Sequence, residues 1–490
     1  MRKSGILMHI SSLPNPYGIG SMGKCAYDFV DFLEAAGQAY WQILPLCPTG
    51  YGDSPYQSFS TFAGNPYLID LDMLIEEGLL TKEEASAPFW GSDETRVDYG
   101  SLYNNRSKLL KLAFDRFTPD SAFSCFVEEN ADWLEDYGLF MALKEKFHGQ
   151  PWQKWSVSLM MRLPEIMASY RQELAEEIKF QQFQQYLFFR QWKALRSYAN
   201  DKGIRIIGDV PIYVPLDSAD VWANPQLFQL DSSCRPKMVA GCPPDSFTAD
   251  GQLWGNPLYD WDKMKQQGYA WWIKRLAAAA RIYDVVRLDH FRGFESYWAV
   301  PAGDKTAAGG CWKQGPAFDF INAIKTALPE LDFIAEDLGF LTPEVKKLQL
   351  DSGYPGMKVL QFAFDSREES DYLPHTYTVN SVCYTGTHDN LTMQQWFDEA
   401  VPEDIVLAKA YLGLNEEEGY VWGTIRGCMG SVSKLCVVQM QDYLGLGGEA
   451  RMNFPGTLSS NNWSWRAEPG CITEDLAAKI YDMTKRYGRL

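Results

Sequence analysis

The sequence predicts an α/β protein built on a (β/α)8 barrel, of the TIM-barrel class, with subdomains inserted between the strands. Short apolar runs that are typical of buried strands alternate with helical periodicities, and this alternation indicates parallel strands joined by helices. About eight such runs are present, which is the number that closes a barrel. The 490 residues are 46% hydrophobic and 22% charged, which is ample for a large core.

Helix-forming segments separate most of the predicted strands. In residues 25–36, for example, Phe29, Phe32 and Leu33 share one helix face and Gly37 follows as a stop signal. The strand-like runs are residues 5–10, 40–46, 204–210, 283–288, 332–335, 358–364 and 381–385, with 435–440 as the candidate for the eighth strand.

Two gaps between the strands are too long for simple crossovers, and they predict insertions into a single catalytic barrel that spans residues 1–490. Residues 65–200 form a predicted subdomain that is mainly helical. Residues 214–268 are rich in Pro, Asp, Gly and Trp and show little periodicity, so we expect an ordered loop subdomain over the active site. The helices expected in the first insertion are residues 104–117, 123–144, 163–174 and 176–200.

Charge and cysteine usage exclude several classes of partner and compartment. The net charge is −18 and no block of Lys and Arg stands out, so we expect neither nucleic acid nor an anionic membrane surface as a partner. The ten cysteines contain no C-x-x-C pair, which favours reduced, buried thiols and a cytoplasmic protein. No apolar run approaches the length of a membrane span, and the stretch from Ile6 to Met8 is too short for a signal peptide core.

The stretch Arg-Leu-Asp-His-Phe-Arg-Gly at residues 287–293 places Asp289 just beyond a predicted strand. Taken alone, it could be an ordinary Arg–Asp pair that closes the strand. The same pattern recurs, however, at Asp209, Glu336 and Asp389, which also follow apolar runs. Because barrel enzymes keep their chemistry at the C-terminal ends of the strands, the four acids together predict one acidic pocket.

Two of these acids suit the chemistry of a retaining glycoside reaction, which needs a nucleophile and an acid/base about 5–5.5 Å apart. Asp289 lies next to Arg287, which we expect to lower the pKa of the carboxyl group and keep it anionic for nucleophilic attack. Glu336 follows apolar residues that would raise its pKa for acid work. Asp337 is adjacent to Glu336, and only one of the two can face the site from a strand. Asp389 could bind sugar hydroxyls and stabilise the transition state.

The five histidines show no metal-binding spacing, so no metal is expected. His290 and His388 each adjoin a proposed catalytic acid, and we interpret them as neutral hydrogen-bond donors to sugar hydroxyls. For His148 and His375 an ordinary structural role is the simpler interpretation. No phosphate-binding glycine loop is present, and no cofactor is expected.

Three further segments offer groups for sugar binding, and each also has a structural alternative. Tyr51, Asp53 and Ser54 lie in a glycine-bearing segment that could equally be a turn-rich connection. Trp254 offers a stacking face, but it could instead be a buried anchor of its loop. Asn462 belongs to a segment near the C-terminus that could line the rim of the site.

Taken together, these motifs closely resemble glycoside hydrolase family 77, the 4-α-glucanotransferases of the amylomaltase type. The resemblance runs almost from end to end and is carried by long motifs in the same order. Cys242 and Ser246 depart from the family's pattern at loop positions away from the carboxylates. The matching segments are residues 9–14, 48–56, 208–211, 243–257, 287–293, 336 and its neighbours, 387–389 and 462–466.

The resemblance implies a (β/α)8 barrel with inserted subdomains and without a C-terminal β-sandwich domain. It implies Asp289 as nucleophile, Glu336 as acid/base and Asp389 as stabiliser of the transition state. The residues expected to bind substrate are Arg287, His388, His290, Asp209, Tyr51, Gln252 and Trp254, to which the segments above add Asp53, Ser54 and Asn462.

The implied reaction moves a segment of an α-1,4-glucan from a donor to the 4-hydroxyl of glucose or another glucan, through a covalent ester on Asp289. The expected partners are maltooligosaccharides, fragments of starch or glycogen, and glucose as acceptor. Closure of residues 243–257 over the ester would keep water out. Two alternatives remain open at this point: a retaining hydrolase of the α-amylase type with the same carboxylates, and a non-catalytic carbohydrate-binding barrel.

Overall fold

The computed structural model describes residues 2–244, 249–339, 341–367 and 370–490. Eight parallel strands close a barrel in the order β1-β12-β11-β10-β9-β6-β3-β2, which confirms the predicted fold class. The barrel strands are β1 (Lys3–Leu7), β2 (Tyr40–Gln42), β3 (Arg205–Val210), β6 (Val285–Leu288), β9 (Asp332–Ala335), β10 (Gly356–Val359), β11 (Ser381–Tyr384) and β12 (Leu435–Gln439).

Each of the eight predicted strand runs overlaps a barrel strand, but several of the predicted ends are wrong. The run at 358–364 is the clearest case, because β10 ends at Val359 and a 3-10 helix, Leu360–Ala363, follows it. Leu360 and Ala363 are buried like strand residues. An apolar run therefore predicts burial, but it does not distinguish a buried strand from a buried turn.

Alternate side chains of the barrel strands point inward, and on β3 and β6 these inward positions change from apolar to charged residues toward the C-terminal end. Ile207 and Val285 belong to the cluster that fills the barrel interior, together with residues from β1, β9, β10, β11 and β12. Asp209 and Arg287 stand two positions further along β3 and β6, so they lie on the same inner face. The barrel is therefore apolar inside and ends in charged groups at the C-terminal ends of its strands.

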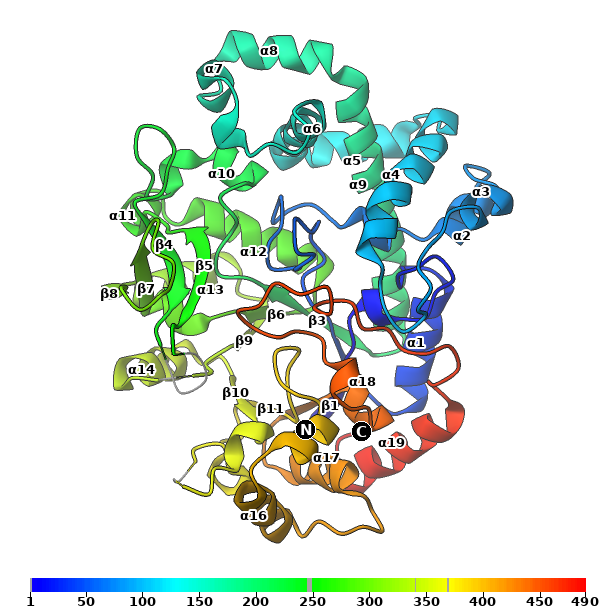
Figure 1. Cartoon of the computed structure of the whole chain (residues 1–490), viewed down its shortest axis with the longest axis vertical. Coiled ribbons are helices and arrows are strands. Elements are labelled where there is room, and N and C mark those ends of the chain that lie inside the picture. The colour runs from blue at the N-terminus through cyan, green and yellow to red at the C-terminus, as the bar shows by residue number, and fades with distance from the viewer. Residues whose placement is uncertain (1, 245–248, 340, 368–369) are drawn as a thin grey trace.

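Helices cover the outside of the barrel, and the C-terminal helix closes it next to the first helix (Figure 1). Arg489 is fully buried after the last helix and donates to the carbonyl groups of Lys3, Met429 and Ser433. The chain end is thereby joined to the barrel. The main outer helices are α1 (Lys24–Ala35), α12 (Ala270–Ile282), α13 (Ala317–Ala327), α14 (Pro343–Ser352), α15 (Met393–Glu399), α16 (Pro402–Leu412), α17 (Tyr420–Gly430) and α19 (Glu474–Arg486).

The segment between β2 and β3 is mainly helical, and its helices lie together beyond one side of the barrel (Figure 1). The single helix predicted at 123–144 is in fact two helices, because the chain breaks at Asn130, whose side chain donates to the carbonyl of Phe126. The helices are α2 (Leu71–Glu76), α3 (Lys82–Ser86), α4 (Tyr99–Arg116), α5 (Ser121–Glu129), α6 (Ala131–Lys146), α7 (Val157–Met160), α8 (Pro164–Glu173) and α9 (Ala175–Asp201).

The segment 214–268 is not the loop without regular structure that its composition suggested. It contains α10 (Ala219–Ala223), β4 (Met238–Cys242), β5 (Gln252–Pro257) and α11 (Trp261–Gln266). With β7 (Ser296–Pro301) and β8 (Cys311–Gln314), β4 and β5 form an antiparallel sheet in the order β5-β4-β7-β8. Sequence patterns did not reveal this sheet, because β4 pairs with β7 and the barrel strand β6 lies between these two strands in the sequence. Residues 245–248 of the predicted lid, including Ser246, lie outside the described residues.

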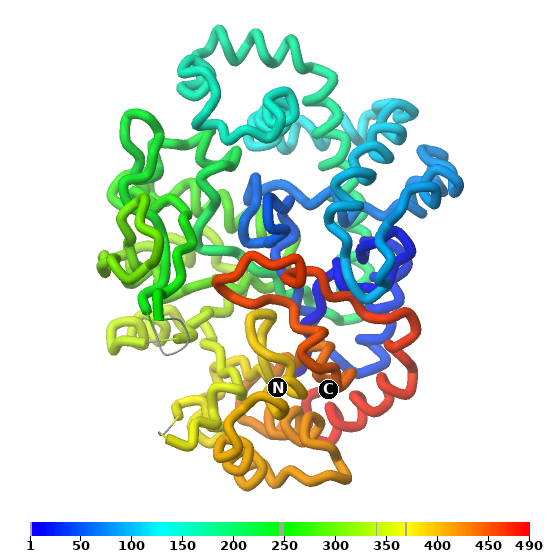
Figure 2. Tube along the Cα trace, in the orientation of Figure 1, coloured from blue at the N-terminus to red at the C-terminus, as the bar shows by residue number. Residues whose placement is uncertain are grey.

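The segment after α18 (Met440–Leu444) crosses the middle of the molecule before α19, as the orange-red tube in Figure 2 shows. It is tied to the first insertion through Val97, which donates to the carbonyl of Ser464, and to the N-terminal part through Ser12, which accepts from Ala467. Beyond β12 the regular elements of the described residues are α18, a 3-10 helix at Gly448–Ala450 and α19. None of the described helices combines the length and apolar character that crossing a bilayer requires.

Candidate active site

Arg287 joins two of the predicted acids at the mouth of the barrel. Its Nη1 lies 2.5 Å from Asp209 Oδ2 and 3.1 Å from Asp289 Oδ1. Arg287 and Asp209 are almost fully buried, whereas a quarter of the Asp289 side chain is accessible. The arginine therefore fixes the position of Asp209 and orients the more open carboxylate of Asp289.

Glu336 enters the site, and Asp337 turns away from it. Glu336 Oε2 accepts a hydrogen bond of 2.6 Å from the amide of His290, next to Asp289, and Oε1 accepts one of 3.0 Å from Leu338. Asp337 Oδ1 instead accepts from the amide of Met357 on β10 at 2.7 Å. The ambiguity between the two neighbouring acids is thereby removed.

Asp389 approaches from the loop after β11. Its Oδ1 accepts a 2.7 Å hydrogen bond from Asn453 Nδ2 and lies 3.5 Å from His388 Nε2. Arg451 Nη2 donates to the backbone carbonyl of Asp389 at 2.8 Å. Two residues of the C-terminal crossing segment therefore hold this acid, whereas the sequence had indicated only that their segment could line the rim of the site.

Tyr56 forms an aromatic wall that the sequence analysis did not single out. Its hydroxyl donates to Asp209 Oδ2 at 2.8 Å, and its ring stacks on His388 with the centroids 5.2 Å apart. Trp463 lies beside both rings, at 5.7 and 5.9 Å. The available signal was its place in the segment 48–56, but the contact with Asp209 depends on a pairing 153 residues apart.

Burial controls the protonation of the two central carboxyl groups. It raises the pKa of Asp289 to about 7, against the opposing charge of Arg287. The expectation that Arg287 would hold this pKa below its usual value was wrong, because loss of hydration outweighs the attraction. Burial likewise raises the pKa of Glu336 to about 8, again opposed by Arg287, while the charge of Asp289 adds to the rise.

The site histidines are neutral. Burial lowers the pKa of His290 to about 3, with Arg292 adding to the effect, and burial also lowers the pKa of His388. His9, at the end of β1, has a pKa of about 3 for the same reason, and its Nδ1 accepts from the amide of Leu44 at 3.2 Å. Neutral imidazoles are able to donate to sugar hydroxyls without adding positive charge.

The predicted residues of the loop after β2 are not all brought to the carboxylates. Tyr51 is 92% exposed. Ser54 Oγ accepts from the amide of Tyr56 within its own turn. Asp53 has a left-handed φ of 59° and lines a pocket that also includes His9, and burial raises its pKa to about 6. Only Asp53 of the three thus has a carboxyl or hydroxyl group in a pocket beside the site.

Trp254 and Asn462 differ in whether their side chains are free to contact a substrate. The Trp254 ring meets the His290 ring edge-on at 4.8 Å, and its Nε1 donates to Gln252 Oε1 at 3.1 Å, so β5 brings both residues toward the site. Asn462 is buried, its Oδ1 accepts from Phe454 and its Nδ2 donates to Thr457. Its amide is therefore already used to hold the turn between these two residues.

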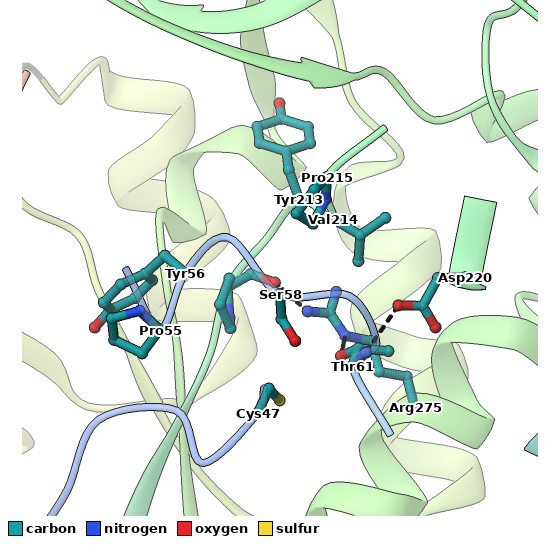
Figure 3. A pocket seen from close by; sticks show the side chains of 11 residues that line it. Cys47, Pro55, Tyr56, Ser58, Thr61, Tyr213, Val214, Pro215, Asp220 and Arg275 are labelled. Atoms are coloured by element: carbon teal, nitrogen blue, oxygen red, sulfur yellow. Dashed lines mark hydrogen bonds between the residues drawn. The ribbon is translucent and has the colours of Figure 1, made fainter. Parts of the chain in front are cut away.

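A small pocket lies behind Tyr56, between the loop after β2 and the segment after β3 (Figure 3). Arg275 Nε donates to Thr61 Oγ1 at 2.7 Å, and Asp220 Oδ2 accepts from the amide of Thr61 at 2.8 Å. Its lining does not include the three proposed catalytic carboxylates. These contacts brace the loop that carries Tyr56 rather than form the reaction site itself.

In the described ranges, no group of three or more His, Cys, Asp or Glu side chains is arranged to hold a metal ion. The chemistry available at the mouth of the barrel is therefore that of an arginine, neutral imidazoles, aromatic rings and carboxyl groups of unequal proton affinity. A parallel barrel with such a carboxylate cluster at its C-terminal end is typical of an enzyme that acts on glycosidic bonds.

Comparison with known proteins gives the family. Residues 8–473 match glycoside hydrolase family 77, described as 4-alpha-glucanotransferase. The chain is 50% identical over 486 residues to the 4-alpha-glucanotransferase of Clostridium butyricum, covering 98% of this chain and 100% of that one. It is 48% identical to that of Thermus thermophilus, covering 100% and 99%. The chain belongs to this family and is an enzyme with 4-alpha-glucanotransferase activity.

Solved structures agree with this assignment. The amylomaltase from Streptococcus agalactiae, in complex with acarbose, superimposes with a TM-score of 0.97 and 42% identity over the whole of both chains. The amylomaltase from Corynebacterium glutamicum, at 17% identity and a TM-score of 0.77 over all of this chain and 75% of that one, shares the fold.

Proposed function

We propose that the enzyme moves a segment of an α-1,4-glucan from a donor to the 4-hydroxyl of glucose or another glucan by a retaining double displacement. Asp289 attacks the anomeric carbon and forms a glucosyl ester while Glu336 gives its proton to the departing glycosidic oxygen. Glu336 then takes the proton of the incoming hydroxyl, whose oxygen displaces Asp289 from the anomeric carbon. Over the two steps one glycosidic bond is broken and one is formed, the ester on Asp289 is made and then broken, and a proton returns to Glu336.

The observation that carries this proposal is the pairing of Asp289 with Glu336 through neighbouring groups. Glu336 accepts from the amide of the residue that follows Asp289, and the two carboxyl groups interact electrostatically. Burial raises the pKa of both carboxyl groups, and a charge on Asp289 raises that of Glu336 further, which favours a proton on Glu336 while Asp289 is charged. That arrangement suits an acid and a nucleophile.

The other side chains suit the binding of a glucosyl unit. The ring of Tyr56 offers an aromatic face for a sugar ring. His388 offers a donor, and Asp389 an acceptor, for the hydroxyl groups of the glucosyl unit. Asp389 is well placed to stabilise the positive charge that develops in the transition state, because the amide of Asn453 holds its carboxylate in one orientation. We propose α-1,4-glucans as donors and glucose or shorter glucans as acceptors.

We further propose that residues 65–200 and 214–268 act as subdomains, and that residues 243–257 act as a lid. Trp254 on β5 already reaches His290, which supports a position of this hairpin beside the acids. A lid that excludes water favours transfer over hydrolysis. Shortening the hairpin should therefore raise the share of hydrolysis, measured as new reducing ends formed per glycosidic bond transferred. An unchanged share would contradict the lid.

Incubation with maltotriose tests the function directly. Transfer predicts glucose together with a ladder of glucans longer than maltotriose. The rival hydrolase of the α-amylase type predicts shorter products only. A binding protein without activity predicts neither. Separation of the products by chain length distinguishes the three outcomes.

Replacing the proposed nucleophile tests the mechanism. In Asp289→Ala the ester cannot form, so turnover should fall by several orders of magnitude, about 10⁴-fold or more, while maltooligosaccharides still bind. Turnover and calorimetric binding of acarbose would be compared with those of the unaltered enzyme. Turnover at the original rate would remove Asp289 from the role of nucleophile.

A further inference from the structure

The loop that carries His388 and Asp389 begins at Thr385, directly after β11, and ends at Met393, the first residue of α15. Both ends are bound to a single side chain. Asp442 on α18 accepts from Thr385 Oγ1 through Oδ2 at 2.5 Å and from the amide of Met393 through Oδ1 at 2.7 Å. One carboxylate thus closes the base of the loop.

The base of this loop is tightly packed as well as bonded. Gln361 Nε2 donates to the carbonyl of Leu391 at 2.7 Å. Gln439 Nε2 donates to the same carbonyl at 3.4 Å, and both amides lie close beside Gly386. The two glutamines therefore hold the loop at a further point between the ends that Asp442 binds.

Burying the carboxylate of Asp442 at this position has a high desolvation cost. It is fully buried, and the ion pairs found among the described residues include none with Asp442. Burial raises the pKa of its carboxyl group to about 6, which reflects the cost of the buried charge. A carboxylate nevertheless accepts stronger hydrogen bonds than a neutral group does, so the charge stiffens both attachments.

We propose that Asp442 is a positioning residue for the transfer reaction, because it fixes both ends of the loop that places His388 and Asp389 around the reacting sugar. It does not touch the substrate and acts through these two residues. The inference rests on the proposed role of Asp389. The simpler alternative is a stabilising cap on α15 with no effect on catalysis.

The test compares Asp442→Ala and Asp442→Asn with a matched control elsewhere in the fold. Asp70 is also buried, and its carboxylate also accepts from one helix amide, Met73, at 2.9 Å and from one hydroxyl, Ser21, at 2.5 Å, but at the start of α2. Asp70→Ala should lower the melting temperature and leave kcat unchanged. Asp442→Ala should lower kcat by about 100-fold, as expected when a reacting group moves by about 1 Å.

The conservative variant and a double substitution separate positioning from stability. Asp442→Asn keeps an acceptor for Met393, and its amide can donate to the Thr385 hydroxyl, so it should recover most of kcat. In an Asp389→Asn background, adding Asp442→Ala should lower kcat by less than about threefold, because the loop then has no carboxylate left to place. Wild-type kcat in folded Asp442→Ala, or a full additional 100-fold loss in the Asp389→Asn background, would overturn the proposal.

If Asp442→Ala does not fold, Thr385→Val removes only one of the two attachments and Thr385→Ser restores it. The first should lower kcat about 10-fold and the second should not, and equal kcat in both would count against positioning. The proposed function is read separately from the product ladder of the unaltered enzyme. An intact ladder with no effect at Asp442 defeats this inference alone, whereas a missing ladder defeats the transfer reaction.

Discussion

At the scale of single residues, the site depends on two carboxyl groups that burial makes unusually basic. Asp289 must be charged and Glu336 must hold a proton for the proposed first step. Their raised pKa values, about 7 and about 8, leave a narrow window in which both conditions hold. The same burial that strengthens the electrostatics of the site therefore restricts the pH at which it works.

The pH profile follows from these values. With rising pH, kcat/KM for maltotriose should increase through about 7, as Asp289 loses its proton, and decrease through about 8, as Glu336 loses the proton it must donate. Initial rates measured between about pH 5 and about pH 10 check this bell shape. In Glu336→Gln the alkaline limb should disappear along with most of the activity. A profile that stays flat across the whole range would contradict the assignment.

Tyr56 combines a hydrogen bond to Asp209 with a stack on His388, and two substitutions separate these contacts. Tyr56→Phe keeps the ring and should lower kcat/KM about 10-fold, the usual effect of losing a hydrogen bond to a charged group. Tyr56→Ala removes the wall as well and should cost about 100-fold or more. Tyr411→Phe, on the outer helix α16, serves as the control with unchanged kinetics. Equal kinetics for Phe and Ala at position 56 would show that the ring has no part in binding.

At the scale of elements, the crossing segment between α18 and α19 connects the first insertion to Asp389, the proposed stabiliser of the transition state. Arg96, just before α4, donates to the carbonyl of Glu449 and to Ser464 Oγ in this segment. Further along it, Arg451 and Asn453 hold Asp389. The insertion is thus joined to the site through a short path of hydrogen bonds.

Removing the last contact in this path tests its importance. Asn453→Ala leaves Asp389 Oδ1 without its amide donor and should lower kcat about 10-fold, with a smaller change in KM, because Asp389 is proposed to act mainly in the transition state. Ser460→Ala changes an exposed side chain of the same segment and is the matched control. Steady-state rates on maltotriose distinguish the two variants. A loss of equal size in both would indicate general damage to the segment.

At the scale of the whole molecule, the two chain ends meet at Arg489. Its guanidinium group donates to backbone carbonyls of Lys3, Met429, Ser431 and Ser433, in a place without access to water. The last helix and the strands β1 and β12 are therefore held by one side chain. The site lies at the other ends of those strands, so this residue should affect stability without affecting chemistry.

Arg489→Ala should leave several buried carbonyl groups unpaired and lower the free energy of unfolding by about 3 kcal/mol or more. Arg486→Ala, an exposed arginine in the last turn of α19, should change it by less than about 0.5 kcal/mol. Denaturant unfolding gives the comparison, and kcat per folded molecule should be equal in both. A lower kcat in folded Arg489→Ala would mean that a change at this end of the barrel alters the site at the opposite end.

Much of the fold and part of the site could be predicted from local pattern. Every barrel strand overlaps a predicted run, although β1 and β10 begin before theirs and the run at 358–364 extends past β10, and β3 and β6 were recognised together with the acids beyond them. The sheet β5-β4-β7-β8 was missed, because its central pairing, β4 with β7, joins strands that lie on either side of β6 in the sequence. Tyr56, Arg451 and Asn453 were placed only in segments that could bind sugar or line the rim, since no local feature shows which distant partner a residue contacts.

The sequence by itself determined which residues alternate into the barrel and which charged groups stand at the strand ends, because side-chain direction along a strand follows from backbone geometry alone. Only the tertiary structure decided in which direction the pKa of Asp289 moves, which of Glu336 and Asp337 lies beside Asp289, and what holds Asp389. Burial and hydrogen-bond partners depend on which distant segments meet, and that information is not present in any one stretch of the chain.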